Sequence, residues 1–479
     1  MIVITGVTQI FTLMKSSMVA GQFGTTMEMD AYNFANSIVS FVFGFIASAA
    51  STVIIPSYIR DDDRKGTDSF ITMMYAVLAF VVTAMIMLRY QLIGLFSNRG
   101  EMYLNIACNV LWILFLANFL FSITNITTAY FQCIGKYNIP KILNLITQIS
   151  TVIALLVFQN LTIIQYAIIM ALSFLINTAI DIPIAVKCGW RFKPSFAFRN
   201  PQTLKLLRMF FPIIFSTGIY KVSLLIDSTI AARLDVGQLS ILGYSTQIVN
   251  MVNTILLGNL TTYCYPKIVK RIKEKKSQSL FWEQTSFFHL VVCLMFAGFV
   301  TVGHDGIAIL FEHGRFGAQA TDMVYICAMI YLAGQPINMV RDLIYRYFYA
   351  VGDTATPASN SVLVSIVNIS VSLILVQFIG LYGIILGTVM ASLASLIRIV
   401  RAFHKKIKFD VSKKKLLVSF AANLLIALVT IAVVYLTKLL IPIGSVFLSL
   451  LLFGTETLAV FVLLTVIIKR NIISVIRNI

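Results

Sequence analysis

The stretch IVITGVTQIFTLMKSSMVAGQFG, residues 2–24, is long and apolar enough to cross a lipid bilayer as a single helix. Stretches of the same kind recur through all 479 residues, and the chain is 59% hydrophobic but only 12% charged. Because the bilayer interior offers no water to backbone groups, such segments form helices that satisfy their own hydrogen bonds. The sequence therefore predicts an all-α integral membrane protein.

Apolar windows of about 20 residues predict about fourteen transmembrane helices. The first window has neither a basic region before it nor a small-residue cleavage site, which indicates a true span rather than a removable signal peptide. The windows lie near 2–24, 31–57, 69–94, 103–131, 139–158, 162–186, 206–234, 239–265, 281–303, 319–350, 356–378, 380–401, 415–437 and 444–468.

The basic residues are distributed unevenly between alternate loops, although the net charge of +18 also suits a nucleic-acid partner. With the N-terminus placed inside, the inner loops and ends hold roughly 30 of the 37 Lys and Arg residues, and the outer loops roughly four. This asymmetry predicts that both termini are cytoplasmic. Basic inner loops lie beside anionic lipid, so no nucleic-acid partner is expected.

Sequence signatures of catalysis are absent from the chain. It has no P-loop, GxSxG or HExxH motif, its six cysteines show no CxxC spacing, and its four histidines show no metal-ligand spacing. We therefore expect a protein that is not an enzyme, without a disulfide framework or transition-metal site. Any transport must draw its energy from an ion gradient or the membrane potential.

The two halves of the chain resemble each other. LMKSSMVAG (13–21) aligns with LIDSTIAAR (225–233), and the following span ends with PSYIR (56–60) in one half and PKIVK (266–270) in the other. An even number of spans separates the copies, so both run in the same direction through the membrane. This pattern predicts a parallel repeat with its axis along the membrane normal.

The repeat and a polar break together predict the domain organisation. KCGWRFKPSFAFRNPQTLK (187–205) combines basic, aromatic and Pro residues between two hydrophobic blocks, which is typical of a cytoplasmic linker. We predict an N-terminal six-helix bundle, this linker, a second six-helix bundle, and a C-terminal helix pair with its tail. Their residue ranges are 1–186, 187–205, 206–404 and 405–479.

Lys15 is the most conspicuous charge inside a predicted span. It lies roughly 13 Å along the helix from the span's end, farther than a lysine side chain comfortably reaches. It should therefore face a cavity or an anionic partner. One interpretation is a structural ion pair with Asp30 or Asp227, and the other is a substrate site in which the ammonium binds phosphate.

Other charges near the spans leave similar alternatives. Asp227 follows Lys221 by six residues, so the two do not share a helix face and are not expected to neutralise each other. Asp227 is interpreted as a cation or proton site, or as the partner of Lys15. Asp30 opens the second span on the predicted outer side. It is interpreted either as an N-cap carboxylate or as a residue with a functional role on that side.

Three motifs in order carry a family resemblance: ILFEHGRFGAQATD (309–322), YRYFYAVGDTATPA (345–358) and GLYGIILGTVMAS (380–392). They resemble the MurJ/MviN branch of the MOP exporter superfamily, which contains the bacterial lipid II flippases. FPIIFSTGIYKVSLLIDSTIAARL (211–234) is similar to the family's seventh helix, and FGTTMEMDAYNFAN (23–36) to the turn between its first and second helices, so the resemblance covers nearly the whole chain.

The resemblance implies a fold, a place and a mechanism. In the family, two bundles enclose a central cationic cavity, and the last two helices shape a groove for a polyprenyl tail. The bundles rock between inward-open and outward-open states and thereby carry a pyrophosphate-linked saccharide across the bacterial plasma membrane.

The family's functional positions carry over only in part. Lys15 stands where the family has an essential first-helix arginine, and Asp30 matches its acidic residue at the outer turn. Gln9, Phe43 and Gln247 stand where well-studied members have cavity arginines. Since glutamine donates hydrogen bonds without bringing charge, the cavity should bind pyrophosphate more weakly or accept a different headgroup.

Some members of the family also bind sodium. Asp227, Asn368 and Thr388 are similar to three of those ligands, whereas Ser372 stands where a second carboxylate is expected. Hard oxygen ligands suit such an ion, but one carboxylate in place of two should lower the affinity.

The resulting prediction is a flippase for an undecaprenyl-pyrophosphate-linked saccharide, most simply lipid II, that acts by alternating access in peptidoglycan synthesis. Lys15 would hold the pyrophosphate, Asp30 would help to close the outer gate, and Asp227 would respond to sodium or protons. The other residues expected to line the cavity are Gln9, Gln247 and Lys221. We expect a monomer.

Three alternatives remain. The cargo could instead be a capsule, teichoic-acid or exopolysaccharide repeat unit, which the missing arginines favour. A cation-coupled multidrug exporter of the same superfamily usually carries cationic cargo, which a cavity lysine disfavours. A non-transporting scaffold for cell-wall synthesis enzymes would make Lys15 and Asp227 dispensable.

Overall fold

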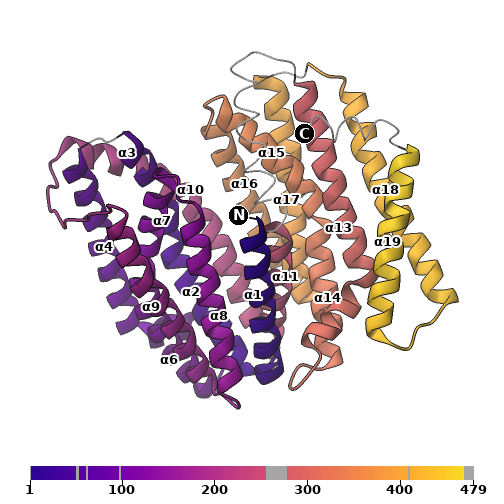
Figure 1. Ribbon diagram of the computed structural model, residues 1–479, viewed down its shortest axis with the longest axis horizontal. Helices are drawn as coiled ribbons and strands as arrows, with labels where there is room; N and C mark the ends of the chain where they lie inside the picture. The colour runs from indigo at the N-terminus through magenta and orange to yellow at the C-terminus, as the bar shows by residue number, and fades with distance from the viewer. Residues whose placement is uncertain are drawn as a thin grey trace. The chain divides into compact units, whose positions relative to one another are not determined.

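The computed structural model describes residues 2–49, 53–60, 63–96, 99–254, 278–407 and 410–468. Within these ranges the regular elements are all helices, and the chain divides into two compact units, Met1–Ser240 and Ile241–Ile479 (Figure 1). The all-helical membrane architecture predicted from the sequence is thereby confirmed. The assignment of bundles to 1–186 and 206–404 stays a prediction, as does the repeat ending at 266–270, which lies outside the described residues.

The N-terminal unit contains ten helices and the start of α11. Their bounds are α1 (Ile2–Phe23), α2 (Met27–Ala49), α3 (Ile55–Arg60), α4 (Arg64–Met87), α5 (Arg89–Phe96), α6 (Glu101–Phe121), α7 (Ile123–Cys133), α8 (Asn138–Val157), α9 (Ile163–Lys187), α10 (Pro201–Ala232) and α11 (Gln238–Val252).

The described part of the C-terminal unit contains the rest of α11 and seven further helices. They are α13 (Ser279–Phe311), α14 (Ala318–Ala333), α15 (Gln335–Ala350), α16 (Ala355–Ile379), α17 (Leu381–Lys406), α18 (Lys413–Leu440) and α19 (Val446–Ile468).

Among the described residues, 12 helical segments are long and apolar enough to span a bilayer. The two long windows predicted from the sequence are each broken in two. α6 and α7 meet at Ser122, and α14 and α15 meet at Gly334, just before Pro336, which lacks the amide needed to continue the helix. α10 covers the predicted span at 206–234, while the one at 239–265 runs into residues outside the described ranges. The count of fourteen therefore stays a prediction.

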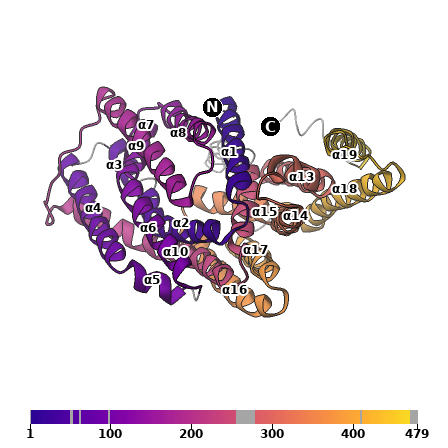
Figure 2. The ribbon, with the colours of Figure 1, turned by 90° about the horizontal axis from the view of Figure 1, so that it is seen from below.

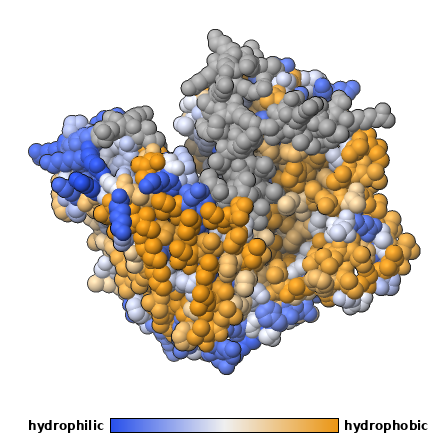
Figure 3. Space-filling view, in the orientation of Figure 1, coloured by the Kyte–Doolittle hydropathy of each residue, from blue (hydrophilic) through white to orange (hydrophobic). Residues whose placement is uncertain are grey.

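In the N-terminal unit, α2 packs against both α6 and α10, and α1 packs against α8. Buried polar contacts join the helices where apolar packing alone would leave their rotation loosely specified. Asn177 of α9 donates to the Leu143 carbonyl (3.0 Å) and to the Thr147 hydroxyl of α8 (2.6 Å). On the face of this unit seen in Figure 3, apolar residues cover the middle and polar ones gather toward both ends, as a spanning protein requires.

In the C-terminal unit, α18 and α19 lie side by side against α13 (Figures 1 and 2). Polar pairs fix this contact: Asn423 donates to the Ser286 carbonyl at 2.9 Å, and the Thr301 and Thr457 hydroxyls lie 2.9 Å apart. α16 and α17 form a tight hairpin because Gly387 lets the backbones approach. A Cβ there would lie 2.3 Å from Ser372 Oγ.

Candidate functional site

Lys15 lies in the middle of α1 and is half-buried. Its ammonium makes no hydrogen bond or ion pair within the part of the chain that the structure describes. A pairing with Asp30 is not formed, because that carboxylate is bound by Arg99. The interpretation of Lys15 as half of a structural ion pair therefore gains no support, and its interpretation as a substrate-site residue stays a prediction.

Gln9 lies on the same helix as Lys15 and is also half-buried. The two positions are six residues apart, which on a continuous α-helix separates their directions by about 120° and their levels by about 9 Å. They can therefore contact an extended headgroup at two levels of one wide cavity. Gln247 lies on α11 in the C-terminal unit and is half-buried.

Lys221 lies on α10 and crosses α2 at Gly44. A Cβ at Gly44 would lie 2.6 Å from Lys221 Cε, so the absence of a side chain there gives the lysine stem its path. Like Lys15, this half-buried ammonium has no hydrogen bond or ion pair among the described residues. The N-terminal unit thus carries two cations inside helices of spanning length, each without a charged partner in the described ranges.

Phe43 differs from a cavity residue in its surroundings. Its side chain is buried on α2, with its ring centroid 6.2 Å from that of Phe115 on α6. The aromatic ring therefore contributes to packing between these helices. An arginine at this position would place a guanidinium in the same apolar contact.

Asp30 is fully buried and accepts hydrogen bonds from three parts of the N-terminal unit. Arg99 Nη1 donates to its Oδ2 at 2.5 Å, and the Gly237 amide donates to the same oxygen at 2.8 Å. The Ser240 amide and hydroxyl donate to Oδ1 at 2.8 and 2.6 Å. Asp30 lies inside the first turn of α2, where the Thr26 hydroxyl accepts a bond from an amide, so Asp30 is not the N-cap.

Arg99 completes this group, which we call the Asp30 clasp: Asp30, Arg99, Gly237 and Ser240. Its Nη2 donates to the carbonyls of Leu234 and Asp235 at 2.6 and 2.7 Å. One guanidinium therefore joins the start of α2 to the turn between α10 and α11. Sequence reasoning missed Arg99, although it is one of only about four cations on the predicted outer side.

Gly237 is required by the geometry of this turn. Its φ is +93°, a left-handed conformation that favours glycine, and a Cβ would lie 2.7 Å from the Thr25 carbonyl oxygen. The turn can therefore press its amides against Asp30 only with glycine at this position.

The predicted sodium ligands divide between the two units. In the C-terminal unit, the hydroxyls of Ser372 and Thr388 each lie 3.2 Å from Asn368 Oδ1, which they reach from α16 and α17. These oxygens are of the hard type that sodium prefers. The α17 backbone at Gly387 packs closely against Ser372. This close packing gives a steric reason for a small hydroxyl at position 372, where a carboxylate was expected. Asp227 is buried on α10 in the N-terminal unit.

A sequence model of the lipid II flippase MurJ family matches residues 19–454. The chain belongs to the lipid II flippase MurJ family. The motif resemblance at 309–322, 345–358 and 380–392 is thereby confirmed.

Curated members of the MurJ family are similar along most of their length. The probable lipid II flippase MurJ of Rickettsia prowazekii is 24% identical over 411 residues, which cover 81% of this chain and 80% of the relative. That of Thermotoga maritima is 22% identical over 426 residues, which cover 82% of this chain and 83% of the relative.

Solved structures show the same fold. A lipid II flippase MurJ in an inward closed conformation matches with a TM-score of 0.84 and 19% identity over 98% of this chain and 99% of that one. An inward-facing multidrug resistance MATE family transporter of the MOP superfamily matches with a TM-score of 0.69 and 14% identity, over 84% of this chain and 94% of that one. The chain therefore has the fold shared by MurJ and MATE transporters.

Proposed function

We propose that the protein carries lipid II from the inner to the outer leaflet of the bacterial plasma membrane for peptidoglycan synthesis, by alternating access and without covalent chemistry. Membership of the MurJ family supports this cargo. The observation that carries the mechanism is Lys15, an ammonium within a spanning helix that has no charged partner among the described residues. A pyrophosphate-linked lipid supplies the complementary anion.

Lys15 and Lys221 would supply the positive charge for the pyrophosphate, and Gln9 and Gln247 would add hydrogen bonds to the headgroup. A lysine binds phosphate as a point charge with rotatable donors, whereas an arginine offers a planar, bidentate fork. A cavity of this composition should hold the pyrophosphate less tightly than an arginine cluster. Weaker holding also favours release on the outer side.

The Asp30 clasp suits the role of an outer closure. It ties the start of α2 to the α10–α11 turn through three hydrogen bonds from Gly237 and Ser240 to the Asp30 carboxylate, and Arg99 adds a fourth. Opening this side would require the carboxylate and the Arg99 guanidinium to separate and become hydrated. We propose that the clasp acts as a gate, and that binding of the cargo shifts the equilibrium between its closed and open states.

For the coupling ion we propose sodium, held by oxygens of Asn368 and Thr388 together with Asp227. The grouping of the first two beside Ser372 supports this. The test is thermal stabilisation of the purified protein by sodium chloride relative to choline chloride. Asn368→Ala should remove the stabilisation, and an unchanged sodium effect in that variant would contradict the assignment.

A different cargo with the same mechanism is the main alternative. Glutamine at 9 and 247 and a packed Phe43 replace cavity arginines, which favours a capsule, teichoic-acid or exopolysaccharide repeat unit with fewer anionic contacts. A multidrug exporter for cations is disfavoured because Lys15 and Lys221 would repel such cargo. A scaffold for cell-wall enzymes would leave both lysines without a role.

The deciding experiment is complementation. The resident lipid II flippase of a bacterial host is depleted, this protein is expressed in its place, and growth is followed together with lipid II on the outer leaflet. Wild type and Lys15→Arg should restore both, whereas Lys15→Ala should restore neither.

Lys187→Ala serves as the matched control, because Lys187 is an exposed lysine in the last turn of α9, on a different helix from Lys15. It should behave as wild type. Full rescue by Lys15→Ala would refute the role of the ammonium. Failure of the wild type, with the protein folded in the membrane, would transfer the proposal to another polyprenyl-linked saccharide.

A further inference from the structure

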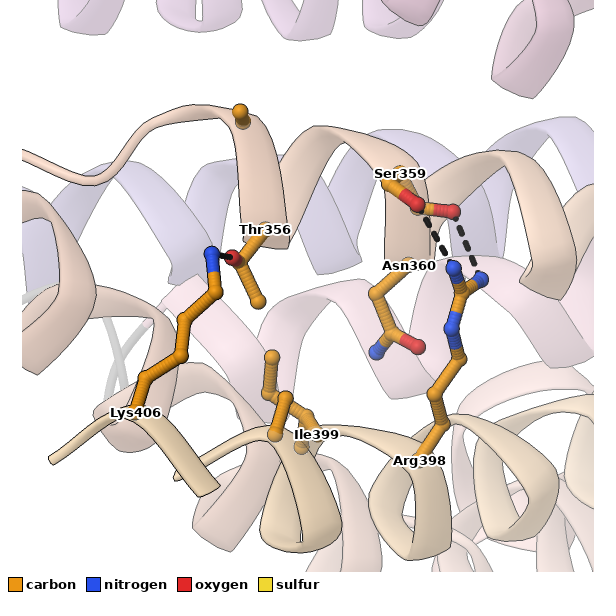
Figure 4. A pocket seen from close by; sticks show the side chains of 8 residues that line it. Thr356, Ser359, Asn360, Arg398, Ile399 and Lys406 are labelled. Carbon is orange, nitrogen blue, oxygen red and sulfur yellow. Dashed lines mark hydrogen bonds between the residues drawn. The ribbon is translucent and has the colours of Figure 1, made fainter. Parts of the chain in front are cut away.

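A pocket of about 290 Å³ lies between the first turns of α16 and the last turns of α17 in the C-terminal unit (Figure 4). Its size is near the lower limit for a small-molecule site, so it suits a headgroup rather than a whole lipid. Its lining combines two cations, three polar side chains and an apolar floor: Arg398, Lys406, Thr356, Ser359, Asn360, Ala355, Ile399 and Ala402.

Arg398 is the principal charge of the pocket. Its two Nη atoms donate to the carbonyl and the hydroxyl of Ser359 at 2.9 and 2.6 Å. A guanidinium has five N–H donors, so this fixed orientation still leaves donors for an anion. Among the described residues the hydrogen bonds of Arg398 go to Ser359 and not to a carboxylate, and a positioned guanidinium suits the oxygens of a phosphate.

Lys406 lies on the other side of the pocket. Its ammonium donates to Asp353 Oδ2 at 2.8 Å and to the Thr356 hydroxyl at 2.6 Å. Asp353 fixes the position of the ammonium and offsets part of its charge. The pocket therefore keeps a net positive charge, which the single negative charge of a phosphodiester is sufficient to neutralise.

Asn360 supplies the second, independent indication of a ligand. Its side chain is 1% exposed, and its Nδ2 is committed to Tyr345 and to the carbonyl and hydroxyl of Ser395. Its Oδ1 is buried and accepts no hydrogen bond among the described residues, and in Figure 4 it points toward the side of Arg398. A buried acceptor without a donor is costly, so a ligand with a hydroxyl donor would satisfy it.

The position of the pocket indicates where such a ligand comes from. α17 ends with His404, Lys405 and Lys406 in its last turn, beside the first turn of α16. On the topology that the loop charges predict, this end faces the cytoplasmic leaflet, where anionic lipids meet basic pockets between helices.

We propose that this pocket binds the headgroup of phosphatidylglycerol, with the phosphate on Arg398 and Lys406 and a glycerol hydroxyl on Asn360 Oδ1. Phosphatidylethanolamine fits less well because the two cations repel its ammonium. Phosphatidic acid offers the phosphate but has no headgroup hydroxyl for Asn360. The inference does not rest on the transport proposal, since it concerns a pocket within the C-terminal unit.

The test is native mass spectrometry of the purified full chain with phosphatidylglycerol, phosphatidic acid and phosphatidylcholine at equal concentrations. The wild type should retain phosphatidylglycerol about tenfold better than phosphatidylcholine. Arg398→Gln should lower phosphatidylglycerol binding by about tenfold, and Asn360→Leu should reduce the preference over phosphatidic acid.

Arg401→Gln is the matched control, because Arg401 is exposed on the same helix and does not line the pocket. It should bind like the wild type. Equal binding by Arg398→Gln and wild type would overturn the proposal. So would displacement of the lipid by inorganic phosphate at equal concentration, which would make the pocket a site for the free anion.

Discussion

Removing the charge of Asp30 should release the α10–α11 turn from the start of α2. In Asp30→Asn, one amide oxygen replaces a carboxylate that accepts four hydrogen bonds. The new amide donors then face either the Gly237 amide and the Arg99 guanidinium or the Ser240 amide and hydroxyl. Arg99 also loses its carboxylate, and its side chain is only 13% exposed. Leaving one half of a buried pair costs about 3–5 kcal/mol, and the partial exposure of Arg99 places the expected cost near the lower limit.

A cost of about 3 kcal/mol corresponds to roughly a hundredfold larger equilibrium constant for opening of the turn. The assay is hydrogen–deuterium exchange of the purified protein, read at the amides of Gly237 and Ser240, both of which donate to Asp30. Exchange there should accelerate by about that factor in Asp30→Asn. Exchange in the middle of α9 should stay unchanged.

Two further variants sharpen this test. Asp235→Asn removes an exposed carboxylate on the same turn, where only the backbone carbonyl contacts Arg99, so it should exchange as wild type. In the double variant Asp30→Asn with Arg99→Gln, the free-energy cost read from amide exchange at the turn should be smaller than the sum of the two single costs. The reason is that no unpaired charge remains. Unchanged exchange at Gly237 in Asp30→Asn would refute the view that this carboxylate holds the turn.

Other consequences of the structure can be measured directly. Gly387→Ala should destabilise the C-terminal unit by about 1–3 kcal/mol, because the new Cβ would lie 2.3 Å from Ser372 Oγ. Gly454→Ala is the control, since a Cβ there meets nothing within 4 Å and should leave the stability unchanged. Denaturation midpoints of the two variants and the wild type measure the difference. The hydrogen bond from Lys406, with those from Thr356, lowers the pKa of Asp353 from 3.8 to about 2. This group therefore contributes stability above pH 3.8 that is lost as the pH falls toward 2. Asp353→Asn should lose less stability than the wild type between these pH values. Identical pH dependence of stability in the two proteins would contradict the assignment.

Several residues of the site could be identified from the sequence, but few of the contacts between them could be predicted. Lys15 and Asp30 stood out because charges near apolar spans are rare and costly. Arg99 did not, because it looks like an ordinary loop cation until the fold brings it to Asp30, 69 residues earlier in the chain. Asn360 was missed for the same reason, since one amide in an apolar helix gives no sign of an unsatisfied oxygen.

The membrane class, the helical segments and the inside-outside charge pattern follow from the sequence because they depend on properties of single segments. A run of apolar residues partitions into lipid and closes its own backbone hydrogen bonds whatever its neighbours are. The partners of Asp30, the path of Lys221 over Gly44 and the orphan oxygen of Asn360 depend instead on how each helix is rotated against others. Those rotations are set by packing between distant segments, so only the folded chain reveals them.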